Sequence, residues 1–126
     1  MVRFDADAYQ KMALETQIYS EAARQFIDEP ATQQLACLEM MYCVGKLNGE
    51  AGEAAEIVFK NFRGAGGYLS GDEKVKLQKE LGDVLWYVAN IAHLIGMPLS
   101  VIMEQNLEKL QDRKDRGVVH GYGDDR

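Results

Sequence analysis

The sequence predicts an all-α protein, a bundle of about four helices. Two observations predict this class. Apolar residues recur at spacings of three and four along most of the chain, and no alternating pattern typical of a β-strand persists. Capping and helix-breaking residues divide the chain into four such segments with short connections, which favours packing of neighbouring helices in a bundle.

Two helices are expected in the first half of the chain. The first begins near the capping residue Asp5, and its apolar face continues to Phe26 before Pro30 interrupts the pattern. The second is long, from about residue 31 to 62, and is followed by the glycine-rich stretch 64–67. Glycine directly after a periodic segment is a common signal for the end of a helix.

Two more helices are expected in the second half. Ser70 and Glu73 have the spacing of a capping box and predict the start of a third helix, which continues to about Ile95. Gly96-Met97-Pro98 then breaks the pattern. A fourth helix is predicted from about Leu99 to Arg113, followed by a glycine-rich, irregular tail.

The composition predicts a single domain spanning residues 1–126. Hydrophobic residues make up 47% of the chain and charged residues 27%, which is ordinary for a folded domain. The net charge of −6 disfavours binding to a nucleic acid polymer, because an acidic surface repels phosphate backbones. No apolar run approaches the roughly 20 residues that span a bilayer, and no signal-peptide pattern opens the chain. We therefore expect a cytoplasmic protein without a membrane partner.

Two pairs of acidic residues have the spacing of neighbours on one helix face. Glu50 and Glu53 lie in the second helix, and Glu80 and Asp83 lie in the third. The third helix is nearly apolar on all sides, so Asp83 is expected in or beside the core. A buried carboxylate is costly unless a cation or hydrogen-bond donors satisfy it. If the third helix returns antiparallel to the second, the two pairs can face each other.

Three glycines, Gly45, Gly49 and Gly52, form a stripe along the second helix. Each costs about 1 kcal/mol relative to Ala in a helix interior, so some interaction should offset the stripe. One explanation is close approach of the third helix, which would bring the carboxylates of both helices around one ion. The alternative is tight packing against another neighbour.

Converging carboxylates repel one another, and divalent cations relieve that repulsion. Ligands that are all oxygen suit Mg²⁺, with Mn²⁺ as a substitute, better than zinc. A di-iron bundle needs a histidine three residues after a glutamate, and neither His93 nor His120 has that position. A Mg²⁺ cluster is a natural binder of polyphosphate, and the sequence contains no P-loop.

At these residues the sequence resembles the MazG-like, all-α nucleoside triphosphate pyrophosphohydrolases. Their signature, Glu-Glu-x-x-Glu and then Glu-x-x-Asp, reads here Gly49-Glu50-Ala51-Gly52-Glu53 and Glu80-Leu81-Gly82-Asp83, and the likeness continues through Asn106-Leu107-Glu108-Lys109. The resemblance implies hydrolysis of a (deoxy)nucleoside triphosphate to the monophosphate and pyrophosphate, with water attacking the α-phosphorus. It also implies a set of Mg²⁺ ligands and catalytic residues: Glu50, Glu53, Glu80 and Asp83.

The first glutamate of the family signature is Gly49 here. The metal ligands are unaffected, but a member that uses this glutamate to activate water must differ from this protein. Either a remaining carboxylate or the metal would then activate the water. Two alternatives stay open: a catalytically degenerate bundle that binds nucleotide or a protein partner, and a related pyrophosphohydrolase that acts on phosphoribosyl-ATP or one pyrimidine dNTP.

Three further residues share a helix face with the carboxylates. Tyr87 and Asn90 lie on the face of Asp83, and Lys60 lies on the face of Glu53. The resemblance suggests that Tyr87 helps to hold the nucleobase, whereas the plain alternative is a core aromatic. Asn90 is interpreted as a contact to a base edge or sugar, or else as a satisfied buried amide. Lys60 is interpreted as a phosphate contact, or else as part of a solvated helix end.

The fourth helix carries Lys109 and Arg113, whose side chains are of the types that bind phosphate. The resemblance supports Lys109 in this role and extends it to Asn106. Basic residues near a helix C-terminus also interact favourably with the helix dipole, which is the alternative explanation.

A thin bundle also leaves large apolar side chains to bury, among them Trp86, Met40, Met41 and Met103. By analogy, a twofold homodimer is the simplest way to bury them, and a tetramer is left open.

Overall fold

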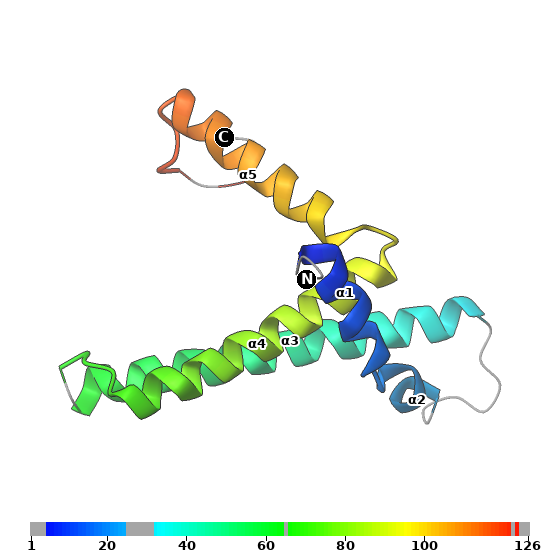
Figure 1. Cartoon of the computed structure of the whole chain (residues 1–126), viewed down its shortest axis with the longest axis horizontal. Helices are drawn as coiled ribbons and strands as arrows, with labels where there is room; N and C mark the ends of the chain where they lie inside the picture. Colours follow the sequence, from blue (N-terminus) through cyan, green and yellow to red (C-terminus); the bar gives the residue numbers. More distant parts are fainter. Residues whose placement is uncertain (1–4, 25–31, 65, 122, 124–126) are drawn as a thin grey trace.

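The computed structural model describes residues 5–24, 32–64, 66–121 and 123. These residues form five helices and no strand, which confirms the all-α class (Figure 1). The helices are α1 (Ala6–Glu15), α2 (Tyr19–Arg24), α3 (Thr32–Gly64), α4 (Gly71–Leu94) and α5 (Leu99–Asp115). Within the described residues no single helix is long and apolar enough to cross a bilayer. Only α4 and α5 taken together meet that length and composition test, and the chain bends by 103° between them.

Helices α3 and α4 form an antiparallel hairpin, the longest packed pair in the molecule (Figure 1). The predicted capping box at the start of α4 is confirmed, because Ser70 Oγ accepts the Glu73 amide at 3.3 Å and the Glu73 carboxylate accepts the Ser70 amide at 2.8 Å. The same carboxylate accepts a 2.8 Å hydrogen bond from Asn61 Nδ2 near the end of α3. This contact links the end of α3 to the start of α4 beside the turn.

The first helical segment is not continuous, so the prediction of one helix towards Phe26 is wrong. Helix α1 ends at Glu15, and Thr16 forms its C-cap. The Thr16 hydroxyl donates to Ala13 O at 3.0 Å and accepts a 2.8 Å hydrogen bond from the Trp86 indole on α4. Beyond this break, α2 packs on α3, whereas α1 packs on α4 and α5. Phe26 and Pro30 themselves lie outside the described residues.

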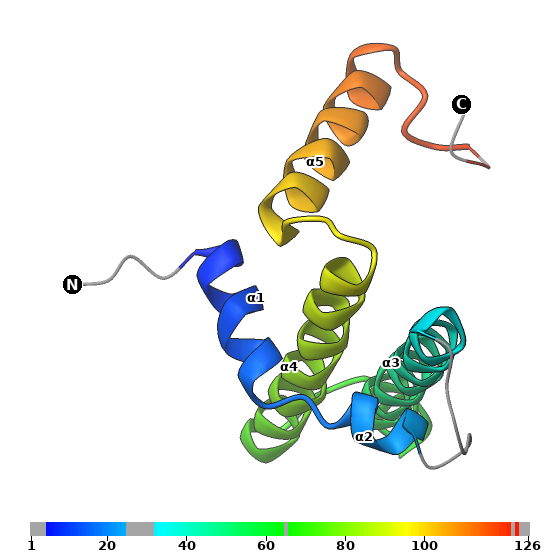
Figure 2. The same ribbon diagram turned by 90° about the vertical axis from the view of Figure 1, so that its right-hand side faces the viewer.

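Helix α5 projects away from the α3–α4 hairpin (Figures 1 and 2). Within the described residues it contacts α1 and α4 but not α3. The turn before it passes through Gly96 with φ of +71°, a conformation that glycine adopts without steric cost. Asp7 of α1 then caps α5 from outside, since its carboxylate accepts the Ser100 amide at 2.9 Å and the Ser100 hydroxyl at 2.7 Å.

Gln10 provides a second link between α1 and this corner, and its side chain is buried. Its amide nitrogen donates to Ala89 O at 3.2 Å and to Met97 O at 3.0 Å, while its oxygen accepts the Leu99 amide at 3.0 Å. The Leu99 amide lies in the first turn of α5 and has no acceptor within that helix, so the buried Gln10 side chain satisfies it and links α1 to the α4–α5 corner.

A buried apolar cluster lies where α1, α4 and α5 meet, at Ala13, Ala89, Ala92 and Leu99. Further buried apolar residues lie on α2 and α3, at Tyr19, Ala23 and Cys43. Two expectations about packing are wrong within the described chain. Helix α4 is not buried all round, because Leu81 and Leu85 are about half exposed where no described element covers them. The glycine stripe of α3 has no close neighbour either: a Cβ atom at any of its three positions would meet nothing within 4 Å.

Candidate metal centre

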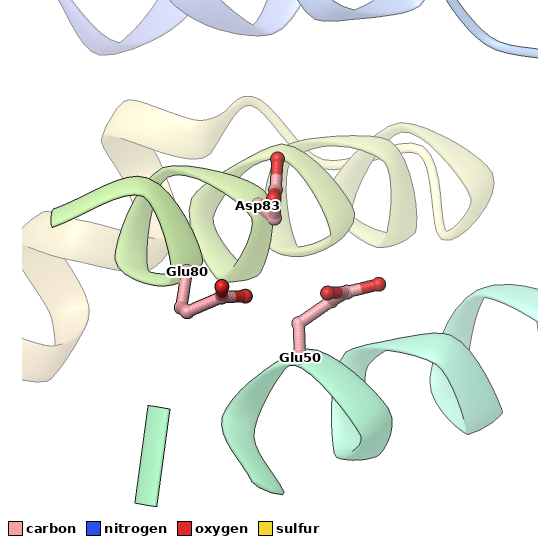
Figure 3. Close-up of side chains that lie close together, drawn as sticks. All are labelled: Glu50, Glu80 and Asp83. Carbon is pink, nitrogen blue, oxygen red and sulfur yellow. The ribbon is translucent and has the colours of Figure 1, made fainter. Parts of the chain in front are cut away.

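Three of the predicted carboxylates converge where α3 passes α4. Glu50 of α3 and Glu80 and Asp83 of α4 each offer an oxygen, and these oxygens all lie within 4.8 Å of one another. Figure 3 shows Glu50 reaching toward α4 and Glu80 reaching toward α3. Glu50 and Glu80 are partly buried, whereas Asp83 is exposed. The expectation that Asp83 lies in or beside the core is therefore wrong, since it sits at the open flank of the helix pair.

Glu53 lies beside this group but does not belong to it. The Glu53 side chain is exposed, and its negative charge acts on the Glu80 carboxyl group. The pKa of Glu80 is raised first by burial and then by the negative charges of Glu53, Asp83 and Glu50. The second of these causes is the repulsion among neighbouring carboxylates, which a bound cation would relieve.

The donor set fits a hard divalent cation. It consists of carboxylate oxygens from two helices, and neither histidine of the chain belongs to it. Mg²⁺ and Mn²⁺ prefer such ligands, and Mg²⁺ is commonly held by one or two carboxylates with water and substrate phosphates completing its coordination. The chemistry of the three residues is therefore compatible with the ion that the sequence predicts.

A lysine that sequence reasoning did not single out also reaches the cluster. Lys46 Nζ lies 3.0 Å from Glu50 Oε1, one helical turn away on α3. The hydrogen bond to Glu50 and the charge of that carboxylate raise the pKa of Lys46, and the phenols of Tyr87 and Tyr42 contribute further. The available signal was the i, i+4 spacing of Lys46 and Glu50, which is typical of an ion pair on a helix.

Aromatic residues lie on the Lys46 side of the cluster. The rings of Trp86 and Tyr87 meet edge to face, with centroids 4.8 Å apart, and Tyr19 contacts Trp86 in the same way at 6.5 Å. Tyr87 is partly buried, and its pKa is raised by burial first. The predicted base-holding residue thus lies near both Lys46 and Glu50.

Asn90 is fully buried, which agrees with one part of the alternative interpretation, but its amide is not fully satisfied. Its Nδ2 donates to Trp86 O at 2.9 Å, while its Oδ1 has no hydrogen-bond partner among the described residues. Because none of its surface is exposed, Asn90 has no direct access to a nucleotide in this conformation.

On the opposite side of the cluster is a cavity of about 280 Å³. Both acidic and basic side chains line it: Glu53, Glu56, Ile57, Lys60, Lys76 and Glu80. Lys60 Nζ lies 3.4 Å from Glu56 Oε1, and both side chains are largely exposed. Lys60 is therefore placed beside the carboxylates, as predicted from its helix face, and Lys76 is a second lysine there that the sequence analysis missed.

A family model described as the MazG nucleotide pyrophosphohydrolase domain matches residues 42–118. The chain belongs to the MazG nucleotide pyrophosphohydrolase family. The Gene 37 protein of Mycobacterium phage L5 is 42% identical over 120 residues, which cover 95% of this chain and 97% of the phage protein. That name states no activity. No solved structure matched the chain.

The MazG match contains α4, α5 and most of α3, and therefore every carboxylate of the candidate centre together with Lys46 and Lys60. Helices α1 and α2 lie outside it. The elements that hold α5 in place through Asp7 and Gln10 are thus outside the matched region.

The predicted phosphate contacts on α5 of this MazG family protein are not brought to the centre within one chain. Asn106 and Lys109 are exposed, and Arg113 is 4% exposed with Nη2 donating to Gly123 O at 3.4 Å. In the described residues α5 contacts α4 and α1 but not α3, so these side chains are not placed at Glu50 within one chain.

Proposed function

We propose that the protein is a Mg²⁺-dependent nucleoside triphosphate pyrophosphohydrolase that converts a (deoxy)nucleoside triphosphate and water to the monophosphate and pyrophosphate. One observation carries the proposal: oxygens of Glu50, Glu80 and Asp83, from two helices, lie within 4.8 Å of one another in a chain of the MazG family. Three carboxylates in this arrangement would hold a divalent cation, which would supply positive charge to the phosphates of the substrate.

In this proposal Glu50, Glu80 and Asp83 would hold the ion. Mg²⁺, for which Mn²⁺ can substitute, would neutralise charge on the phosphates in the ground state and the transition state. Water attacks the α-phosphorus, the bond to the bridging oxygen of the β-phosphate breaks, and pyrophosphate leaves. We assign the proton of the attacking water to Glu53, because this carboxylate lies beside Glu80 but outside the three-residue cluster. Glu53 would then take the role of the first glutamate of the family signature, which is replaced by Gly49 in this chain.

Side chains on the two sides of the carboxylate cluster suggest an orientation for the bound nucleotide. Tyr87 lies on the Lys46 side of the cluster and would hold the nucleobase, while Lys60 lies in the cavity on the other side and would contact the terminal phosphates. The nucleotide would then lie along the α3–α4 pair with its α-phosphate at the cluster.

The direct test is a panel of ribonucleoside and deoxyribonucleoside triphosphates with Mg²⁺, with the products identified by chromatography. We expect pyrophosphate and the monophosphate, and loss of turnover in EDTA and in Glu80→Gln. Glu104→Gln is the matched control, because Glu104 is an exposed acid on α5 away from the cluster. Release of orthophosphate in place of pyrophosphate would contradict the proposal.

The same panel separates the alternatives. Nucleotide binding without turnover of any substrate would support a degenerate bundle, for which Gly49 is the motivating residue. A kcat/KM much higher for phosphoribosyl-ATP or a single pyrimidine dNTP than for the other nucleotides would support the related pyrophosphohydrolases.

We also propose that the protein is a homo-oligomer built from dimers. Apolar side chains on the open faces of α4 and α5 are about half exposed in the single chain: Leu81, Leu85, Met103, Leu107 and Leu110. A groove of about 330 Å³ runs between Tyr9, Leu85 and Met103 where these helices diverge. A second copy offers the same apolar face, so a twofold contact would cover both at once.

A further inference from the structure

Lys46 and Glu50 form an ion pair within the carboxylate cluster. Nζ and Oε1 are 3.0 Å apart, and the two residues are one turn apart on α3. The Glu50 side chain is 12% exposed, whereas that of Lys46 is 45% exposed. The less accessible member of the pair is therefore the carboxylate, and the lysine approaches it from the solvent side.

Glu50 cannot serve two cations equally well. Its oxygens belong to the group that also contains Glu80 and Asp83, so an ion held by the three carboxylates would lie close to the Lys46 ammonium. Two positive charges at that distance repel each other, and the repulsion is larger at a partly buried site than in bulk water. We therefore expect a divalent ion to compete with Lys46 for Glu50 and to weaken the ion pair.

The surroundings of Lys46 indicate where its ammonium goes. The phenols of Tyr42 and Tyr87 are close enough to affect it electrostatically. In the antiparallel hairpin, Lys46 precedes Glu50 by one turn and Tyr87 follows Asp83 by one turn. Lys46 and Tyr87 thus lie on the same side of the cluster, and Lys46 is one helical turn from the carboxylates at which the proposed function places the α-phosphate.

We propose that Lys46 is a substrate-binding residue that exchanges partners: it pairs with Glu50 before metal binds, is displaced by the divalent ion, and then contacts the α-phosphate of the nucleotide. The first exchange rests on the ion pair and the cluster, and the second rests on the proposed function. The freed ammonium donates charge-assisted hydrogen bonds to phosphate oxygens, and no bond is made or broken by Lys46 itself.

The metal half is tested by titrating Mn²⁺ alone and measuring free Mn²⁺ by electron paramagnetic resonance. Lys46→Gln is expected to bind Mn²⁺ about two- to fivefold more tightly than the wild type, because the competing pair is gone. Lys46→Arg keeps the charge and should bind like the wild type. Arg116→Gln is the matched control, since it removes the same charge from an i, i+4 pair with Asp112 on α5.

The nucleotide half uses the four α,β-methylene deoxynucleoside triphosphates at saturating Mn²⁺. The most tightly bound analogue is expected to bind Lys46→Gln at least about fivefold more weakly than the wild type, because a hydrogen bond to a charged group is lost. The distinguishing result is that Lys46→Gln raises the affinity for Mn²⁺ and lowers the affinity for the nucleotide analogue. A lysine with only a structural role would not have these two opposite effects.

Three results would overturn the inference. Equal Mn²⁺ affinity in Lys46→Gln and Arg116→Gln would exclude displacement from Glu50. Equal analogue affinity in Lys46→Gln and the wild type would exclude the phosphate contact. No Mn²⁺ binding by the wild type would overturn the proposed metal centre as well, so failure of the proposed function is distinguished from failure of the inference alone.

Discussion

Asp7 of α1 accepts both hydrogen bonds that Ser100 offers at the first turn of α5, from the amide at 2.9 Å and from the hydroxyl at 2.7 Å. The residue before this helix is Pro98, whose side chain cannot cap it. A residue far away in the sequence therefore supplies the cap that helices usually take from their own N-terminal residue. This contact links the orientation of α5 to α1.

The Asp7 cap makes stability depend on pH. The hydrogen bonds from the Ser100 amide and hydroxyl lower the pKa of Asp7 below its ordinary 3.8. A lowered folded-state pKa contributes stability above pH 3.8 that is lost as the pH falls through the folded-state pKa. Asp7→Asn should therefore be less stable than the wild type at pH 7, with a difference that shrinks as the pH falls below 3.8. Urea unfolding of both proteins at a series of pH values measures this.

Ser100→Ala is the control for that experiment, because it removes the hydroxyl donor and leaves the carboxylate in place. It should reduce the pH-dependent difference between the Asp7 forms. A difference between wild type and Asp7→Asn that is the same at pH 7 and below pH 3 would contradict the linkage.

Binding of metal should stabilise the folded protein. The cluster exists only when α3 and α4 are paired, so the ion binds the native state and hardly the unfolded chain. Mg²⁺ at about 100 times its Kd is expected to add roughly 2.7 kcal/mol to the free energy of unfolding. Thermal unfolding in EDTA and in millimolar Mg²⁺ measures the effect, which Glu104→Gln should retain and Glu80→Gln should lose. Equal Tm values of the wild type in the two buffers would argue against the site.

Glu53→Gln should separate chemistry from metal binding. We expect kcat to fall by about 10²- to 10⁴-fold, the usual contribution of a general base, with little change in Mn²⁺ affinity. Glu56→Gln, in the same cavity, is the control and should change kcat far less. If Mn²⁺ affinity falls together with kcat, Glu53 is a metal ligand, as the family resemblance implies, and the assigned proton transfer is wrong.

Charge on the open apolar face should prevent self-association. Leu85→Asp and Leu107→Asp are expected to shift the protein to monomer, because burying a leucine stabilises by about 1.5–3 kcal/mol and a twofold contact buries it twice. Sedimentation velocity measures the mass. Val75→Asp is the control, since Val75 is as exposed as Leu85 but lies near the start of α4. A monomeric wild type would refute the proposed dimer.

Several features could be read from the sequence because they depend on residues a few positions apart. The Ser70–Glu73 capping box, the break at Gly96 and the helix pairs of acidic residues are all of this kind. The convergence of Glu50 with Glu80 also followed, since an antiparallel return leaves few registers that place both apolar faces inward. Lys46 had an equally local signal in its spacing to Glu50 and was overlooked.

Other features depend on contacts between distant segments. The break at Thr16 involves the indole of Trp86, and the direction of α5 is held by Asp7 and Gln10. The exposure of Asp83 could not be inferred from the apolar residues around it, because a periodic pattern records which side chains are apolar and not which neighbour covers them. A helix whose sequence pattern predicts burial can therefore have a solvent-exposed apolar face in the single chain.

The sequence by itself determined the helices of the hairpin, their caps and the acidic pairs on their faces, because hydrogen bonding and side-chain spacing within a helix are set by residues three or four positions apart. Only the tertiary structure decided that Asp83 joins the cluster from an exposed position, that Glu53 lies outside the cluster, and that α5 points away from the centre. These outcomes depend on where one helix lies against another, and that position is the result of many weak contacts spread over the whole chain.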